Sequence, residues 1–153
     1  MDIPSLSKYA KGLGHDDLIA YCSKLRVGDT VLPDPFAVSA ACWSDSLSSW
    51  PPLSFAHIFE YFVLKSGLYT LEQSKNITSL EGYNYFACQH VQPVLYHDPG
   101  VGDCCYLSAK VLPSQRQGQK TNMYECYLVV NKTDGTIVTV HYTCMAGYVL
   151  LFL

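Results

Sequence analysis

The stretch at residues 124–145, YECYLVVNKTDGTIVTVHYTCM, decides the fold of this 153-residue chain. Two sets of side chains alternate along residues 124–131, and residues 136–144 are rich in β-branched and aromatic types, which suit a pleated strand. The link at residues 132–135 ends in a glycine, which tolerates the positive φ that a hairpin turn needs. The stretch therefore predicts a β-hairpin.

Two stretches upstream of the hairpin predict further strands. Residues 104–112 show the same alternation, and residues 91–97 look extended, with Pro93 placing them at a sheet edge or a bulge. A glycine turn at 98–103 and a polar loop at 113–122 connect these strands in sequence. Short links favour an antiparallel meander, and the alternation predicts that one face of the sheet is covered.

Helices are predicted before the strands. Residues 54–65 carry an apolar stripe at helical spacing behind Ser54, a suitable cap, and a capping box begins a second helix at Thr78. Shorter helices are predicted at 5–10 and 16–25. We expect the helices beginning near residues 54 and 79 to cover the sheet. The predicted class is α+β, with N-terminal helices packed on a three- to four-stranded antiparallel sheet.

The chain divides into three predicted parts. Residues 1–53 form a helical and irregular N-terminal arm, residues 54–147 form the helix-plus-sheet domain, and residues 148–153 form an apolar tail. In the arm, Trp43 and Trp50 are expected to anchor it to the domain; stacking on nucleic-acid bases is the alternative. The two short helices faintly resemble a SAP-type DNA-binding module, but their spacing is too short, so a helical edge on the core is the preferred interpretation.

Composition limits the function. A net charge of −3 and a pI near 5.9 give no overall electrostatic footprint for nucleic acid, so such binding needs a local patch. Seven cysteines in irregular spacing, without an N-terminal signal peptide, favour a reduced intracellular compartment, with the nucleus as one option, over a secreted disulfide scaffold. No apolar run approaches the ~20 residues of a membrane span, so no membrane partner is expected.

Several stretches between Trp43 and Gly147 together resemble the segment that leads into a SWIM-type zinc finger. They are SLEGYNYF at 79–86, HVQ at 90–92, YLSAKVLPSQR at 106–116, DGT at 134–136 and HYTCMAG at 141–147. The resemblance is to animal proteins of transposon or viral ancestry that often pair this segment with a YqaJ-type recombinase nuclease. It implies a Cys-x-Cys pair, a spacer and a Cys-x-His pair, with all four side chains on one zinc ion.

The chain departs from that zinc-binding pattern. Cys144 takes the place of the second cysteine, Tyr142 stands at the first, and residues 148–153 hold no Cys-x-His. Structural zinc sites use four ligands, and Cys144 with His141 would supply at most two, which point to opposite faces of a strand. Zinc is thus the cofactor that the family implies, and we expect no ordered zinc site in this chain.

No group of residues predicts catalysis. The nearest cysteine–histidine pairs are Cys88 with His90 and Cys144 with His141, and a buried cysteine usually behaves as a small apolar side chain. His57 and Glu60 have the spacing of a metal pair on a helix, but a solvated face is the preferred interpretation. We therefore expect a protein that is not an enzyme and has no small-molecule substrate.

Lys110, Arg116 and Lys120, separated by glutamines, form the candidate nucleic-acid-binding patch. Basic and amide side chains on a strand end and a loop suit phosphate oxygens, and a solvated loop is the alternative. Two hypotheses follow. The chain is a binding module for DNA or a protein partner, as the scaffold of a SWIM-type zinc finger protein, or it is a vestigial or structural accessory domain of a YqaJ-like nuclease.

Overall fold

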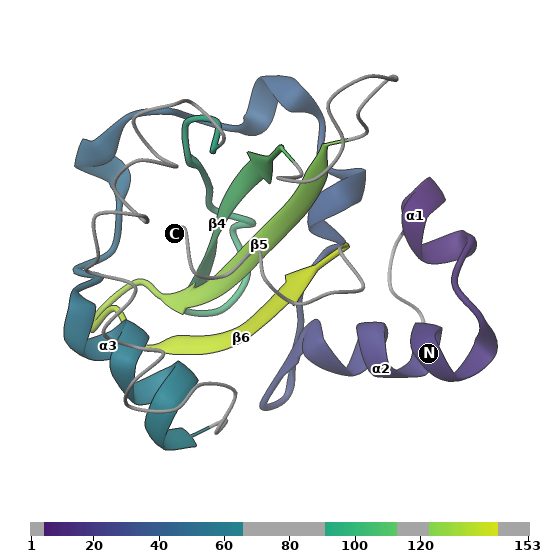
Figure 1. Cartoon of the computed structure of the whole chain (residues 1–153), viewed down its shortest axis with the longest axis horizontal. Helices are drawn as coiled ribbons and strands as arrows, with labels where there is room; N and C mark the ends of the chain where they lie inside the picture. Colours follow the sequence, from purple (N-terminus) through teal and green to yellow (C-terminus); the bar gives the residue numbers. More distant parts are fainter. Residues whose placement is uncertain (1–4, 66–90, 113–122, 144–153) are drawn as a thin grey trace.

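A four-stranded antiparallel sheet lies at the centre of the structure, a computed structural model that describes residues 5–65, 91–112 and 123–143. Its strands are β3 (Leu95–His97), β4 (Cys104–Val111), β5 (Tyr124–Asn131) and β6 (Ile137–Tyr142). They lie in chain order, and β4, β5 and β6 follow one another across the middle of Figure 1. The predicted α+β class and antiparallel meander are confirmed. The short strand β3 is an edge strand, as the proline before it suggested.

The hairpin of β5 and β6 forms as predicted. Tyr127 pairs with His141 and Leu128 with Val140, and the register shifts beside Val130. Gly135 in the turn has φ +79°, where a glycine is favoured. A Cβ at this position would also overlap the Pro52 carbonyl, so the turn is packed against the N-terminal part of the chain.

Helices and short turns precede the sheet. The helices are α1 (Lys8–Lys11), α2 (His15–Lys24) and α3 (Phe55–Phe59), and α3 continues as the π-helical segment η4 (Glu60–Lys65). A two-residue hairpin of β1 (Arg26–Val27) and β2 (Thr30–Val31) follows α2, and then come the 3₁₀ turns η1 (Pro35–Ala37), η2 (Ala40–Cys42) and η3 (Leu47–Ser49). Ser54 caps α3 as predicted, with its N–H donated to Nδ1 of His57. The helix predicted from Thr78 lies outside the described residues.

Both faces of the sheet are covered, so the prediction of one covered face was wrong. We call the face carrying Tyr106, Tyr127, Val129 and His141 the N-terminal face, because residues of α1 and α2 pack on it. The other is the opposite face. Buried residues on the N-terminal face are Ala10, Tyr21, Leu25, Leu32, Cys104, Tyr106, Tyr127 and Val129. Buried residues on the opposite face are Phe62, Cys105, Leu107, Leu128, Val130, Ile137 and Val140.

The reason for this error is the composition of β4 and β5. In each strand one set of alternating side chains is apolar or aromatic throughout, and the other set is apolar or aromatic where β4 and β5 meet the N-terminal residues, at Cys104, Tyr106, Tyr127 and Val129. Helices α1 and α2 lie beside the sheet, to the right in Figure 1, with α2 in contact with β6. Helix α3 lies on the other side of the figure, and η4 contributes Phe62 to the opposite face.

The two tryptophans join the irregular segment to the sheet, as expected of anchors. Trp43 packs on the N-terminal face, 5.2 Å from the ring of His97, and Trp50 packs on the opposite face. Residues before position 54 thus contribute to the packing on both faces. Among the described residues, no helix has both the length and the apolar character of a membrane span.

Candidate functional site

Lys110 is the one predicted site residue that lies in the described part of the chain; Arg116, Lys120 and Cys144 lie outside it. Lys110 stands near the end of β4, directly opposite Glu125 of β5. Its Nζ is 3.2 Å from Oε1 of Glu125, and the two side chains are 53% and 39% exposed. An exposed pair of this kind contributes at most about 1 kcal/mol to stability, so the Lys110 ammonium is exchangeable with another anionic partner.

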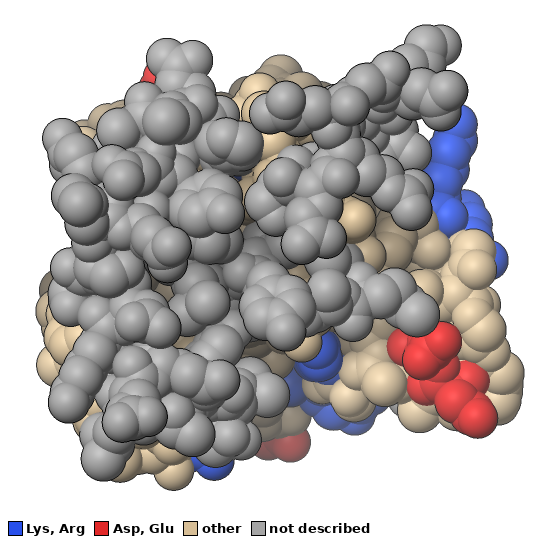
Figure 2. Space-filling model, in the orientation of Figure 1, with Lys and Arg blue, Asp and Glu red and all other residues tan. Residues whose placement is uncertain are grey.

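The other described cations divide into two groups. Lys65 and Lys132, like Lys110, are in ion pairs, whereas the four cations that form no ion pair with a described residue lie near the N-terminus. These four are Lys8, Lys11, Lys24 and Arg26. Acidic side chains of α2 lie among them, and Figure 2 shows blue and red atoms together on this side of the molecule. This side therefore carries mixed charge.

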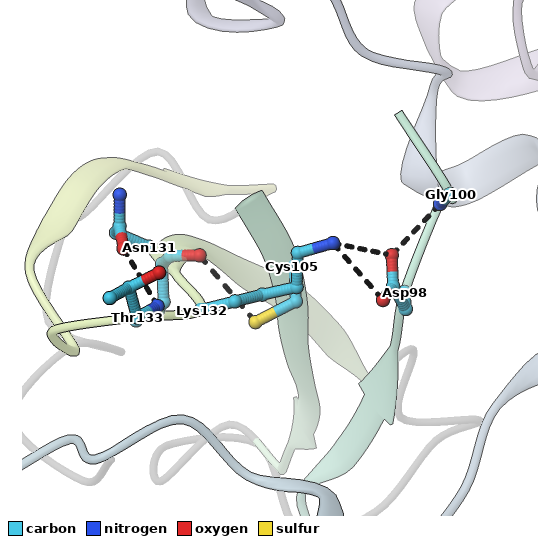
Figure 3. Close-up of polar contacts among 7 residues, drawn as sticks. Asp98, Gly100, Cys105, Asn131, Lys132 and Thr133 are labelled. Carbon is cyan, nitrogen blue, oxygen red and sulfur yellow. Dashed lines mark hydrogen bonds and ion pairs between the residues drawn. The ribbon is translucent and has the colours of Figure 1, made fainter. Parts of the chain in front are cut away.

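Asp98 and Lys132 join the turns at one end of the sheet (Figure 3). The ammonium of Lys132 is 3.2 Å from both carboxylate oxygens of Asp98, and the Gly100 N–H donates to the same carboxylate at 2.8 Å. The Gly100 N–H, and secondarily Lys132, hold the pKa of Asp98 below its usual value. The backbone N–H of Lys132 also donates to the Asp103 carbonyl. The turn at residues 98–103, with Asp98 and Asp103, is therefore joined to the turn between β5 and β6 through Lys132.

The turn between β5 and β6 is held by the side chain of Asn131, and Cys105 of β4 contacts the strand beside it. Asn131 Oδ1 accepts from the Thr133 N–H at 2.8 Å, and the thiol of Cys105 donates to the Val130 carbonyl at 3.5 Å (Figure 3).

Within residues 5–65, 91–112 and 123–143, no three His, Cys, Asp or Glu side chains come close enough to hold a metal ion.

His141 lies in a cluster of aromatic rings on the N-terminal face. Its ring centroid is 4.7 Å from that of Tyr21, 5.6 Å from those of Tyr9 and Tyr127, and 6.1 Å from that of Phe36. His141 Nε2 is 2.9 Å from Tyr9 Oη, in hydrogen-bond contact. Burial, aided by the positive charge of Lys24, lowers the pKa of His141 to about 4. The imidazole is therefore neutral near pH 7.

Asp34 supplies the buried acid of the same region. It is 1% exposed, and its carboxylate accepts from the Tyr21 hydroxyl at 2.6 Å, the Ser7 N–H at 2.8 Å and the Phe36 N–H at 2.9 Å. Burial, with Tyr127 and Asp34 nearby, raises the pKa of Tyr21. The Tyr127 hydroxyl is buried and has no hydrogen-bond partner among the described residues. The network joins the residue before α1, helix α2 and the turn η1 to one another.

The strand cysteines are enclosed by the sheet. Burial raises the pKa of the Cys105 and Cys126 thiols to about 12, and it also raises the pKa of Cys104. Near neutral pH these side chains are thiols, which are poor nucleophiles. Cys42, in contrast, is exposed. The predicted pairs of Cys88 with His90 and Cys144 with His141 involve residues outside the described part of the chain.

Sequence reasoning missed the contacts of Tyr9, Asp34 and His141. The local sequence gives one signal, an aspartate between Pro33 and Pro35, which suits the capping role that Asp34 has at η1. No local signal relates Tyr9 to His141, because 132 positions separate them. The contact between Tyr9 and His141 depends on how α1 and β6 pack against each other.

Comparison of the chain with protein-family models, with curated proteins and with solved structures finds no match. The class that the fold defines is an α+β domain with an antiparallel meander covered on both faces. This architecture does not by itself specify a function, so function has to be argued from the charged and buried groups described above.

Proposed function

We propose that the chain is a non-catalytic binding module that contacts nucleic-acid phosphates through Lys110, Arg116 and Lys120. The observation that carries the proposal is the exposed ammonium of Lys110 at the end of β4. The polar stretch 113–122, which carries the other two cations, begins two positions after that strand in the sequence. Three cations on a strand end and in the stretch that follows it suit successive phosphates of a nucleic-acid backbone.

The setting of the potentially reactive side chains supports a role in binding rather than in catalysis. The thiols of Cys105 and Cys126 are protonated and enclosed, and the neutral imidazole of His141 is surrounded by aromatic rings. Asp34 is saturated by three hydrogen-bond donors. A reactive group needs access to its substrate, and these groups are instead enclosed by the packing on one face of the sheet or the other.

We further propose that the chain is the scaffold of a SWIM-type zinc finger protein, which its sequence resembles. The described residues do not fit a zinc ion, since His141 Nε2 is committed to Tyr9 and its ring lies among four others. Cys144, the family position, lies outside the described residues. The proposed binding therefore uses charged side chains, without a metal.

The test is filter binding of a short DNA duplex to the full chain at low and moderate salt. Each phosphate contact gives a slope of about −0.9 in log affinity against log salt, so three contacts predict a slope of about −3. The double variant Arg116→Ala/Lys120→Ala should weaken binding at low salt and reduce the slope by about 2. A chain that does not bind DNA, or whose variant binds equally well, would support the structural accessory domain instead.

Lys65 provides a matched control for Lys110. Lys65 is 54% exposed and pairs with Glu60 at 3.2 Å, nearly the same geometry as Lys110 with Glu125. Lys110→Ala should weaken DNA binding and Lys65→Ala should not. Glu125→Gln should strengthen binding, because it removes the anion that competes with phosphate, whereas Glu60→Gln should leave binding unchanged. Equal effects of the two lysine variants would contradict the proposal.

A further inference from the structure

Two hydrogen bonds attach the N-terminal helices to neighbouring residues of β6. Tyr9 of α1 reaches His141, with Oη 2.9 Å from Nε2, and Lys24 at the end of α2 donates to the Val140 carbonyl at 3.1 Å. Helix α1 has four residues; its Ala10 is fully buried, and Leu6, Tyr9 and Leu13 pack on the same core. The tyrosine–histidine contact adds a direct hydrogen bond from α1 to the sheet, and protonation of the imidazole removes its ability to accept.

The groups around His141 leave little to balance a positive charge on its ring. Aromatic rings approach it from α1, α2, η1 and β5, and Tyr142 follows it in β6. Lys24 adds a positive charge from α2. Asp34 is the buried acid on this side, and its carboxylate already accepts three hydrogen bonds, while Asp17 in the first turn of α2 acts on Tyr9. The tyrosines are neutral in acid, since the pKa of a phenol is ordinarily about 10, and burial raises the pKa of Tyr9, Tyr21 and Tyr127 further.

We infer that His141 makes the attachment of helices α1 and α2 to the sheet acid-sensitive, so that acidification loosens the N-terminal face before the opposite face. The direction of the pH effect follows from the enclosed position of the His141 ring in the folded chain. His141 takes up a proton near its ordinary pKa when its ring is in water, but near 4 when it is enclosed. Between these two values, lowering the pH favours the state in which the ring is exposed.

The two tryptophans report on the two faces separately. In Trp50→Phe the remaining Trp43 reports the N-terminal face, and in Trp43→Phe the remaining Trp50 reports the opposite face. Fluorescence of each variant is followed as the pH is lowered from neutral. We expect the Trp43 signal to change about one pH unit above the Trp50 signal.

Two histidine variants separate the proposed effect from local quenching. The ring of His97 lies 5.2 Å from that of Trp43 and can quench its fluorescence directly. The difference between the two midpoints should persist with His97→Gln. It should disappear with His141→Gln, which keeps a hydrogen-bonding side chain but does not titrate. Coincident midpoints in the natural chain, or a difference that survives His141→Gln, would overturn the inference.

A second measurement applies if His141→Gln does not fold. The imidazole C–H resonance of His141 is titrated by NMR in the natural chain, together with the ring signals of Tyr9. We expect the Tyr9 signals to change with His141 protonation, well below the ordinary pKa of a histidine. Titration of His141 at the ordinary value, with unchanged Tyr9 signals, would contradict the inference.

Discussion

Asp34 is a buried carboxylate with no cation bonded to it among the described residues. Its charge is balanced instead by two backbone N–H groups and the hydroxyl of Tyr21. The donors come from Ser7 before α1, from α2 and from η1, so one side chain fixes three segments. Sequence alone indicated a cap at this position at most, because two of its partners depend on tertiary packing.

Substitution of Asp34 should strongly destabilise the protein. Asp34→Ala leaves three donors without an acceptor, two of them buried and one partly buried, and we expect it to lower the free energy of unfolding by about 3 kcal/mol or more. Tyr21→Phe removes one of the three donors and should cost about 1–2 kcal/mol. Urea unfolding followed by circular dichroism measures both. Equal, small losses in the two variants would show that the carboxylate is not the centre of this network.

Two glycines allow backbone strain and close packing to be separated. Gly28 and Gly135 both have positive φ, but a Cβ at 28 meets nothing within 4 Å, whereas a Cβ at 135 overlaps Pro52. We expect Gly28→Ala to cost about 1–2 kcal/mol from strain alone. Gly135→Ala should cost about 3 kcal/mol or more, because overpacking adds to the strain. Chemical denaturation tests this, and equal costs would mean that the turn does not pack against Pro52.

At the scale of elements, local signals predicted the strands of the four-stranded sheet and the helix that begins after Ser54, whereas the hairpin of β1 and β2 was not predicted. Alternation and a glycine turn located the hairpin, and an apolar stripe located the helix at 54–65, although its second half is π-helical. The number of covered faces of the sheet could not be predicted from such local signals. Alternation shows that successive side chains of a strand point to opposite faces of the sheet. Whether one face or both are covered depends on segments that are distant in the sequence.

The candidate site was predictable only in part, for the same reason. Lys110 was predicted as a candidate from its charge and its place near a strand end. Its partner Glu125 depends on the register between β4 and β5, which the sequence does not specify. The cluster around His141 unites residues from α1, α2, η1 and two strands, and no sequence spacing relates them.

The sheet should protect its thiols from modification. Cys105 and Cys126 are buried with a pKa of about 12, whereas Cys42 is exposed. Brief alkylation of the native chain near pH 8, followed by mass spectrometry, should label Cys42 and leave Cys105 and Cys126 unmodified. Unfolding in urea should make all of them reactive. Rapid native labelling of Cys126 would contradict the placement of β5 inside the sheet.

At the scale of the whole molecule, His141 links stability to pH. Its pKa is lowered in the folded state, so the unfolded chain binds more protons as the pH falls below about 6.5. Stability should therefore fall between pH 6.5 and 4, by about 2 kcal/mol after allowance for partial solvent screening. His141→Phe should flatten this dependence in urea titrations at several pH values. An unchanged dependence would assign it to other groups.

The central structural claim is that residues near the N-terminus and the β5–β6 hairpin form one core. The most direct measurement is the set of nuclear Overhauser effects between the Tyr21 ring and the rings of His141 and Tyr127 at neutral pH. Ring centroids of 4.7 Å and 6.4 Å predict clear cross-peaks for the first pair and weaker ones for the second. Complete absence of both sets in the folded chain would contradict the account.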